Sequence, residues 1–167
     1  MLLKRALREF LLSRTSITDV VNNNVFTVFD PVPTNANFSV LKKFYPSITI
    51  HTLSNTPQPC SNRATNIFLE DIQLEARGLV EPQKLISCVP AQRQEAEDQI
   101  KTLEDFANVI RRLVYMKQGP MNEVQLMSTQ LRDFTNVQTE LNPALKTNFA
   151  LYRMIFRFSV LYGEPSA

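Results

Sequence analysis

The chain has 167 residues, 44% of them hydrophobic, which is enough for one domain with a core that needs neither disulfides nor a metal. Its 18 Lys and Arg residues and 16 Asp and Glu residues leave a net charge of +2. This balance excludes nonspecific nucleic-acid binding as the main activity, because such binding requires a strongly basic surface.

An amphipathic helix is predicted at the N-terminus. One helical face carries Leu3, Leu7, Phe10 and Leu11, and the other carries Lys4, Arg5, Arg8 and Glu9. These charges interrupt the apolar run that a signal peptide requires, and no run in the chain reaches the ~20 residues of a membrane span. Ser16 and Asp19 resemble a loose capping box for a second short helix that ends before Asn22.

Short strands and a loop are predicted next. Val25–Phe29 is prone to β-structure, and the Pro- and Asn-rich stretch 31–43 favours an exposed loop. Ser47–Leu53 is predicted to be a strand with Ile48 and Ile50 on one face.

The middle of the chain is ambiguous. Asn66–Arg77 is predicted as a strand with a slip at Glu70–Asp71, or as an extended hairpin arm that ends near Gly78. Gln83–Val89 is predicted as a further strand, which Pro90 closes.

The longest predicted element is a helix over residues 92–116. Apolar residues recur in it at steps of three and four, namely Ala96, Ile100, Leu103, Ala107, Ile110, Leu113 and Val114. Its acidic first half and the basic Arg111–Arg112 agree with the helix dipole, and Gly119–Pro120 is expected to stop it. A strand over 122–135 and a polar turn over 136–147 are predicted to follow.

The closing strand, Leu151–Tyr162, has the clearest alternation in the chain. Tyr152, Met154, Phe156, Phe158, Val160 and Tyr162 share one face, and Arg153, Arg157 and Ser159 share the other. One such face covers a core, and the other meets solvent or a partner.

Together these elements predict an α+β fold. We expect an antiparallel or mixed sheet covered on one face by the long helix, about 92–116, and by the N-terminal helix. A single domain over residues 1–167 is expected, with extended arms at about 31–44, 55–83 and 119–148.

Motifs for catalysis, metal binding or cofactor binding are missing. The three glycines form no phosphate-binding loop, and one His with two Cys makes no zinc motif, so no catalytic, metal or cofactor site is expected. His51 is the only histidine, and a lone strand histidine is usually solvent-facing or hydrogen-bonded. Cys60 and Cys88 are expected to be reduced and unpaired.

The carboxylate clusters have a simple interpretation. Glu70–Asp71 and the group Glu95, Glu97 and Asp98 are the only candidates for paired acids. The second group lies opposite the apolar stripe of the long helix and is predicted to be a solvated face.

Arg153 and Arg157 are the candidate partner-binding residues. On the polar face of the closing strand they either guard against edge-to-edge aggregation or face an acidic partner subunit or the lumen of a ring.

Several segments resemble the tail-completion and tail-terminator proteins of long-tailed bacteriophages. Tyr45–Pro57 resembles the family's aromatic-Pro-strand segment, and Lys84–Val89 with the following helix resembles its strand-helix unit. Leu151–Tyr162 resembles its closing strand, and Val25–Pro33 fits its short strand and Pro-rich loop. The stretches 61–83 and 121–148 are longer than the family's usual connections.

The resemblance implies a structural virion protein without enzymatic activity. It implies a homo-oligomeric ring, commonly a hexamer, that caps the head-proximal end of the tail tube and joins it to the head connector. The implied partners are the tail tube protein and connector proteins, with DNA passing through the lumen without sequence-specific binding. The implied location is the tail or neck of the virion, assembled in the host cytoplasm, with no membrane involved.

Two other classes of function stay open at this point. One is a different neck or head-completion adaptor of the virion. The other is a small α+β enzyme or ligand-binding domain with a cleft near His51.

Overall fold

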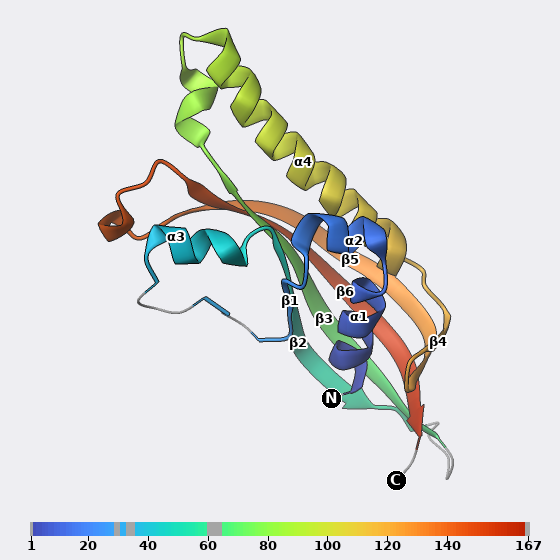
Figure 1. Ribbon diagram of the computed structural model, residues 1–167. Helices are drawn as coiled ribbons and strands as arrows, with labels where there is room; N and C mark the ends of the chain where they lie inside the picture. The colour runs from blue at the N-terminus through green and yellow to red at the C-terminus, as the bar shows by residue number, and fades with distance from the viewer. Residues whose placement is uncertain (1, 29–30, 33–35, 60–64, 166–167) are drawn as a thin grey trace.

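The chain folds as α+β, with a curled, six-stranded mixed sheet and helices packed against it (Figure 1). The computed structural model describes residues 2–28, 31–32, 36–59 and 65–165. The α-helices are α1 (Leu2–Leu12), α2 (Thr15–Val21), α3 (Phe38–Leu41) and α4 (Pro90–Val114), and the 3-10 turns are η1 (Lys42–Phe44), η2 (Pro82–Ile86) and η3 (Pro143–Leu145). The strands are β1 (Val25–Phe26), β2 (Ser47–Pro57), β3 (Thr65–Val80), β4 (Gly119–Met121), β5 (Val124–Glu140) and β6 (Ala150–Pro165).

The strands lie in the order β1-β2-β3-β6-β5-β4. β1 pairs with β2 in parallel, and every other neighbouring pair is antiparallel. The central pair, β3 and β6, runs without a register shift from Thr65 opposite Pro165 to Val80 opposite Ala150. The alternating closing strand of the sequence therefore lies in the middle of the sheet.

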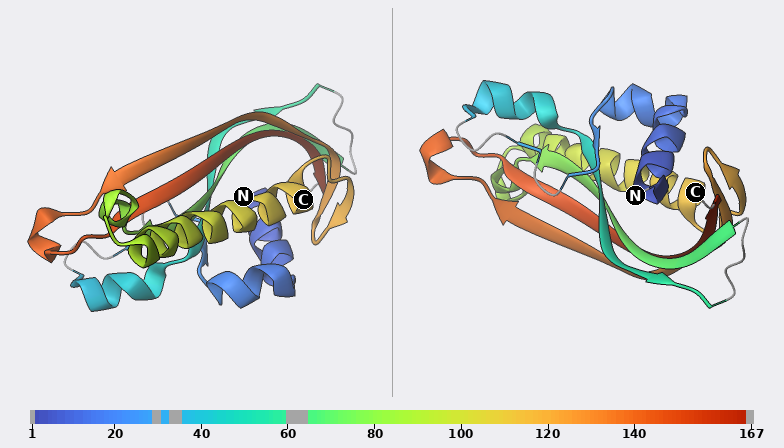
Figure 2. Two further views of the ribbon diagram at one scale, coloured as in Figure 1. Left: turned by 90° about the horizontal axis from the view of Figure 1, so that it is seen from above. Right: turned by 90° about the horizontal axis from the view of Figure 1, so that it is seen from below.

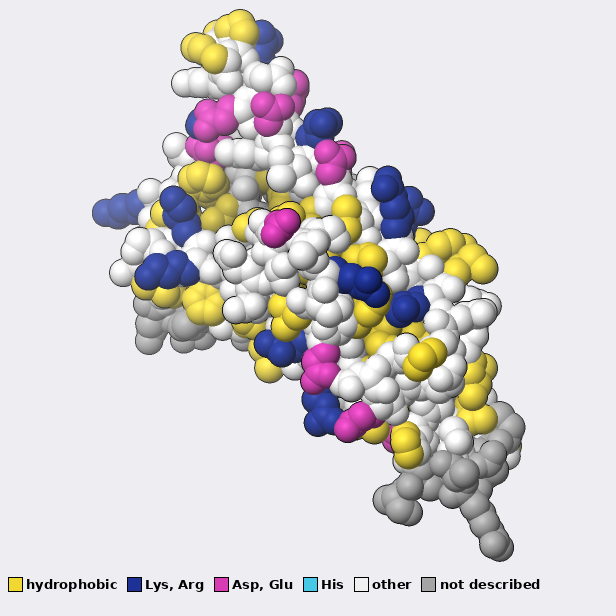
Figure 3. All heavy atoms as spheres, turned by 45° about the vertical axis from the view of Figure 1, so that its right-hand side comes forward, with side chains coloured by type: hydrophobic (Ala, Val, Ile, Leu, Met, Phe, Trp, Pro, Cys, Tyr) yellow, Lys and Arg dark blue, Asp and Glu magenta, His cyan; other side chains and the backbone are white. Residues whose placement is uncertain are grey.

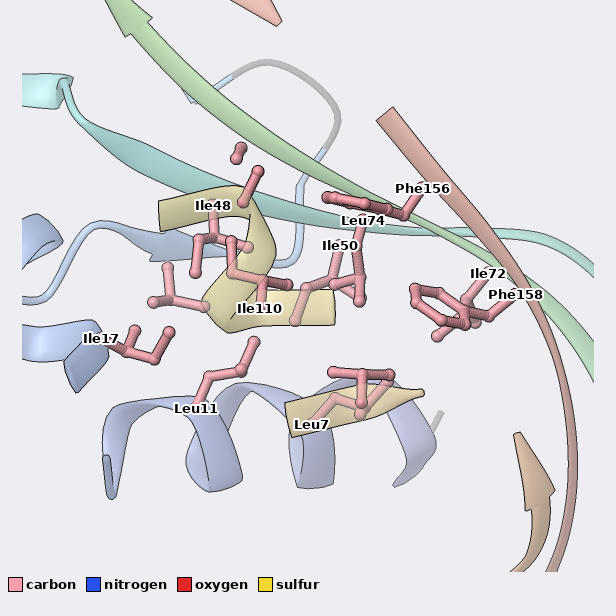
Figure 4. Packing of buried hydrophobic residues seen from close by; sticks show 14 of the residues in the cluster. Leu7, Leu11, Ile17, Ile48, Ile50, Ile72, Leu74, Ile110, Phe156 and Phe158 are labelled. Carbon is pink, nitrogen blue, oxygen red and sulfur yellow. The ribbon is translucent and has the colours of Figure 1, made fainter. Parts of the chain in front are cut away.

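Helices α1, α2 and α4 all cover the same face of the sheet, as Figure 2 shows from above and below. Leu7 and Leu11 of α1, Ile17 of α2 and Ile110 of α4 converge with sheet residues in one core (Figure 4). The sheet contributes Ile48, Ile50, Ile72, Leu74, Phe156 and Phe158, among others, to this core. The predicted faces of the closing strand, the long helix and the N-terminal helix are confirmed.

Residues 65–80 are not an arm but a central strand. β3 itself has no slip at Glu70–Asp71, because Glu70 pairs with Val160 and Asp71 with Ser159 in unbroken register. A register shift does occur beside Asp71, but its extra residue lies on β2. Their charges broke the apolar alternation in the sequence, but both carboxylates accept hydrogen bonds from neighbouring strands. The second expected arm is thus a strand pairing, and β5 likewise extends as a strand to Glu140 through part of the predicted polar turn.

The predicted strand 83–89 is also wrong. Pro82 begins the 3-10 turn η2, and Pro90 occupies the first turn of α4. Residues 83–89 therefore lie between the starts of two helical segments and do not extend as a strand. Ile86 is 80% exposed, which is incompatible with a buried strand. The ion pair of Lys84 with Glu95 at 2.9 Å joins η2 to α4, and Lys84 also pairs locally with Glu81 at 3.0 Å.

Smaller predictions also change. The stretch 31–43 is not wholly loop, since the Asn37 side chain accepts a hydrogen bond from the Val40 amide and starts α3. α2 forms without any side-chain cap, so the predicted capping box is wrong. α4 ends at Val114, ahead of Gly119, because Tyr115 turns to extended backbone.

Candidate functional site

The face of the sheet opposite α1, α2 and α4 carries a charged network. Alternation places Gln73, Glu75 and Arg77 of β3 on this face, opposite Arg157, Ile155 and Arg153 of β6. The equivalent positions of β2 are Ser47, Thr49 and His51. We refer to this surface as the polar sheet face.

Glu75 is the centre of the network and is fully buried. Its carboxylate accepts hydrogen bonds from Arg153 Nη2 at 2.7 Å and Nε at 3.1 Å, from Arg77 Nε at 2.7 Å and from Gln73 Nε2 at 2.7 Å. Burial by itself raises the pKa of Glu75, but the hydrogen bonds and charges of Arg153 and Arg77 outweigh it and hold the pKa below its ordinary 4.5. Glu75 is therefore a charged acceptor that fixes two arginines.

Arg157 is held more loosely than Arg153. Its Nε donates to Gln73 Oε1 at 3.1 Å, and its Nη1 lies 3.4 Å from Asp133 Oδ2. The Arg157 side chain is 48% exposed, against 25% for that of Arg153. The two predicted partner-binding residues share a face, but Arg157 is the one that presents its guanidinium to solvent.

Two β-bulges flank one row of the sheet beside Arg157. Ile72 and Phe158 pair in the middle of this row, with Thr52 of β2 and Leu131 of β5 at its ends. The next residue on each outer strand, Leu53 on β2 and Arg132 on β5, is the extra residue of a register shift. Bulges re-aim side chains, and here both side chains point into one hollow.

The hollow has a volume of about 370 Å³ on the polar sheet face. Its lining consists of Leu53, Leu69, Asp71, Arg132, Arg157, Phe158 and Ser159. Arg132 Nε donates to Ser159 Oγ at 2.9 Å, and Ser159 Oγ donates to Asp71 Oδ1 at 2.5 Å. Within the described part of the chain, Arg132 has no carboxylate within ion-pair distance.

Sequence reasoning missed Arg132. The sequence places it next to Asp133 in a polar stretch, where regular alternation gives no reason to group it with Arg157. The only signal was a cationic side chain near the end of the strand predicted over 122–135, and the bulge that turns it toward Ser159 is a property of the pairing.

His51 lies on the polar sheet face next to Thr49, as predicted, but it is buried and not solvent-facing. Burial lowers its pKa from 6.5; the charge of Glu75 opposes this, while Arg77, Lys4 and Arg153 add to it. The residue is therefore neutral near pH 7, and it lines neither the hollow nor the larger cavity described next.

A second cavity, of about 830 Å³, lies between the N-terminal half of α4 and the sheet. Tyr45, Pro46, Leu79, Leu103 and Phe149 give it an apolar floor, and Glu95, Asp98 and Gln99 line its α4 side. Across residues 2–28, 31–32, 36–59 and 65–165, no three His, Cys, Asp or Glu side chains are grouped so that they could bind a metal. In the same part of the chain no helix combines the length and apolarity of a membrane-spanning segment.

Glu70 was named as a candidate acid from the sequence, but its burial on the helix-covered face was not predicted. Glu70 is fully buried and accepts hydrogen bonds from Thr52 at 2.5 Å, from Tyr162 at 2.7 Å and from Asn55 at 3.0 Å. Burial and the Glu70 carboxylate together raise the pKa of Tyr162. This cluster joins three strands around a fully buried carboxylate, so its role is structural.

The structure describes one of the two cysteines. Cys88 is exposed and unpaired. Cys60, also predicted to be free, lies outside the described residues.

The resemblance of this chain to known proteins is distant. No protein-family model matches the chain, and no curated protein matches it. One solved structure, described as the virion of a native gene transfer agent particle, contains a similar chain with a TM-score of 0.46 and 10% sequence identity, over 95% of this chain and 94% of that chain. A likeness at this level carries no argument about function.

Proposed function

We propose that this chain is a structural virion protein that caps the head-proximal end of a phage tail tube as a homo-oligomeric ring, a hexamer as in the proteins it resembles. The ring joins the tail to the head connector, lets DNA pass through its lumen and has no enzymatic activity. It is assembled in the host cytoplasm and remains in the tail or neck of the virion.

The observation that carries the proposal is the exposure of apolar side chains at both ends of α4. At the first end Leu85, Ile86 and Val89 are 37%, 80% and 49% exposed, on the tip that projects beyond the sheet in Figure 1. At the second end Tyr115 and Met116 are 45% and 64% exposed. Grouped exposed apolar residues mark protein-protein contacts, and a ring subunit between a tail and a head needs several such contacts.

The test is assembly of the full-length chain, alone and with tail tubes that lack their own cap. Mass photometry should find a ring-sized species, and negative-stain images should find it at one end of the tubes. A chain that stays monomeric in the presence of tubes would contradict the proposal.

The same experiment separates the neck or head-completion adaptor, which shares the same assembly logic. That adaptor would appear as a plug on filled heads and would leave the tubes uncapped. The cavity beneath α4 favours a third candidate, a ligand-binding domain. A Thr102→Trp variant narrows that cavity, so unchanged ring formation in this variant would count against ligand binding as the main role.

A further inference from the structure

We infer that the hollow on the polar sheet face receives the acidic segment of α4 from a neighbouring copy of the same chain. This inference rests on the proposed function, because it names the contact by which the subunits join. It assigns a role to Arg132 and Arg157 in the hollow and to residues 95–105 of α4.

The hollow has the composition of an interface anchor. It places Arg132 and Arg157 beside two exposed leucines, Leu53 and Leu69, which are 53% and 37% exposed. Arginine next to apolar side chains is typical of residues that dominate binding energy. Arg132 donates only its Nε within the described residues, to a serine hydroxyl, and this leaves both terminal nitrogens for a carboxylate.

The acids of the polar sheet face do not neutralise all of its arginines. Arg77, Arg132, Arg153 and Arg157 carry four positive charges, and Asp71, Glu75 and Asp133 carry three negative charges. Glu75 pairs with Arg153 and Arg77, and Asp133 pairs with Arg157, so among the described residues Arg132 is the arginine of this face that has no ion-pair partner.

α4 supplies the complementary charge. Between Ala91 and Phe106 the helix has five acids, Glu95, Glu97, Asp98, Glu104 and Asp105, and two bases, Arg93 and Lys101. Figure 3 shows acidic side chains gathered along the upper, projecting part of this helix. Glu97 and Glu104 are exposed and have no ion-pair partner among the described residues, and their spacing of seven places them on one side of the helix, about 10 Å apart.

The two surfaces lie on opposite sides of the subunit. α4 covers one face of the sheet (Figure 2) and exposes its acids away from its buried stripe, whereas the hollow opens on the other face. One subunit cannot therefore satisfy its own hollow. The contact joins copies head to tail, and repetition of such a contact closes a ring when the rotation between copies allows it.

The test uses two charge-reversed variants of the full-length chain, Arg132→Glu with Arg157→Glu and Glu97→Lys with Glu104→Lys. Each should raise the concentration at which rings form by at least tenfold in mass photometry. An equimolar mixture of the two variants should recover rings, because every reversed hollow can then meet a reversed helix. Added salt should weaken ring formation by the wild-type chain.

Controls separate this inference from a folding defect and from the proposed function. Arg112→Glu with Lys146→Glu makes the same charge change at exposed sites outside the hollow and should assemble as wild type. Arg132→Glu alone breaks just one described hydrogen bond, so its thermal melting should match wild type while its assembly is reduced. The inference would be overturned if the chain with Arg132→Glu and Arg157→Glu formed rings as readily as the wild-type chain, or if the mixture of the two variants failed to recover ring formation. Either result would leave the proposed function standing.

Discussion

The Arg153 guanidinium donates hydrogen bonds to both carboxylate oxygens of Glu75, although the two residues are 78 positions apart in the chain. The pair links β6 to β3 at the centre of the sheet, with Arg77 on the same carboxylate. Glu75 is fully buried, so water cannot reach its carboxylate to replace a lost partner.

Glu75→Gln should therefore lower the free energy of unfolding by about 3–5 kcal/mol, because it leaves Arg77 and Arg153 without their counter-charge. Urea denaturation at pH 7 measures the change. Glu123→Gln removes the exposed partner of Arg5 and should change stability by less than about 1 kcal/mol.

The same residue predicts a dependence on pH. The folded-state pKa of Glu75 is below 4.5, so its stabilising contribution is present above pH 4.5 and is lost as the pH falls through the folded pKa. Wild-type stability should fall below pH 4.5 more steeply than that of Glu75→Gln. Equal slopes for the two chains between pH 5 and pH 3 would contradict this prediction.

Tyr162→Phe should destabilise the fold by about 1.5–3 kcal/mol. The change removes the hydroxyl that donates to the buried Glu70 carboxylate at 2.7 Å and leaves a charged acceptor short of a donor. Tyr152→Phe is the matched control on the same strand face, since Tyr152 has no hydroxyl hydrogen bond among the described residues, and its melting temperature should hardly move.

Gly78→Ala should destabilise the packing of α4 on the sheet. A Cβ at this position would fall inside the van der Waals contact distance of the buried Leu103 side chain, and overpacking of this kind costs about 1–3 kcal/mol. Leu103→Ala in the same chain makes room for the methyl group. Denaturation of the two single variants and the double variant should give a double-variant loss that is smaller than the sum of the single losses.

Ile86→Ala and Leu7→Ala should differ sharply. Leu7 is buried in the core, and its truncation should cost about 2–5 kcal/mol, whereas Ile86 is exposed and its truncation should change stability by about 0.5 kcal/mol or less. Thermal denaturation of both variants measures this. A large loss for Ile86→Ala would restore the sequence-based prediction that residues 83–89 form a buried strand.

The closing strand and the long helix were predictable because their burial follows one period along the chain. The core face of β6 and the apolar stripe of α4 each repeat at the spacing of their own element, so a single stretch of sequence contains the whole signal. Run 83–89 shows the limit of that reasoning. Its apolar residues were correctly noticed, but flanking prolines and the ion pairs of Lys84 turned them into an exposed tip.

The sequence by itself determined the α+β class, the N-terminal helix, the long helix and the two faces of the closing strand, since these depend on local periodicity. Only the tertiary structure decided that β3 is central, because its charged residues are balanced by partners on other strands, far away in the chain. The hollow on the polar sheet face likewise exists only in the tertiary structure. Leu53 and Arg132 reach it through bulges, and a bulge arises from how two strands pair, which neither strand encodes alone.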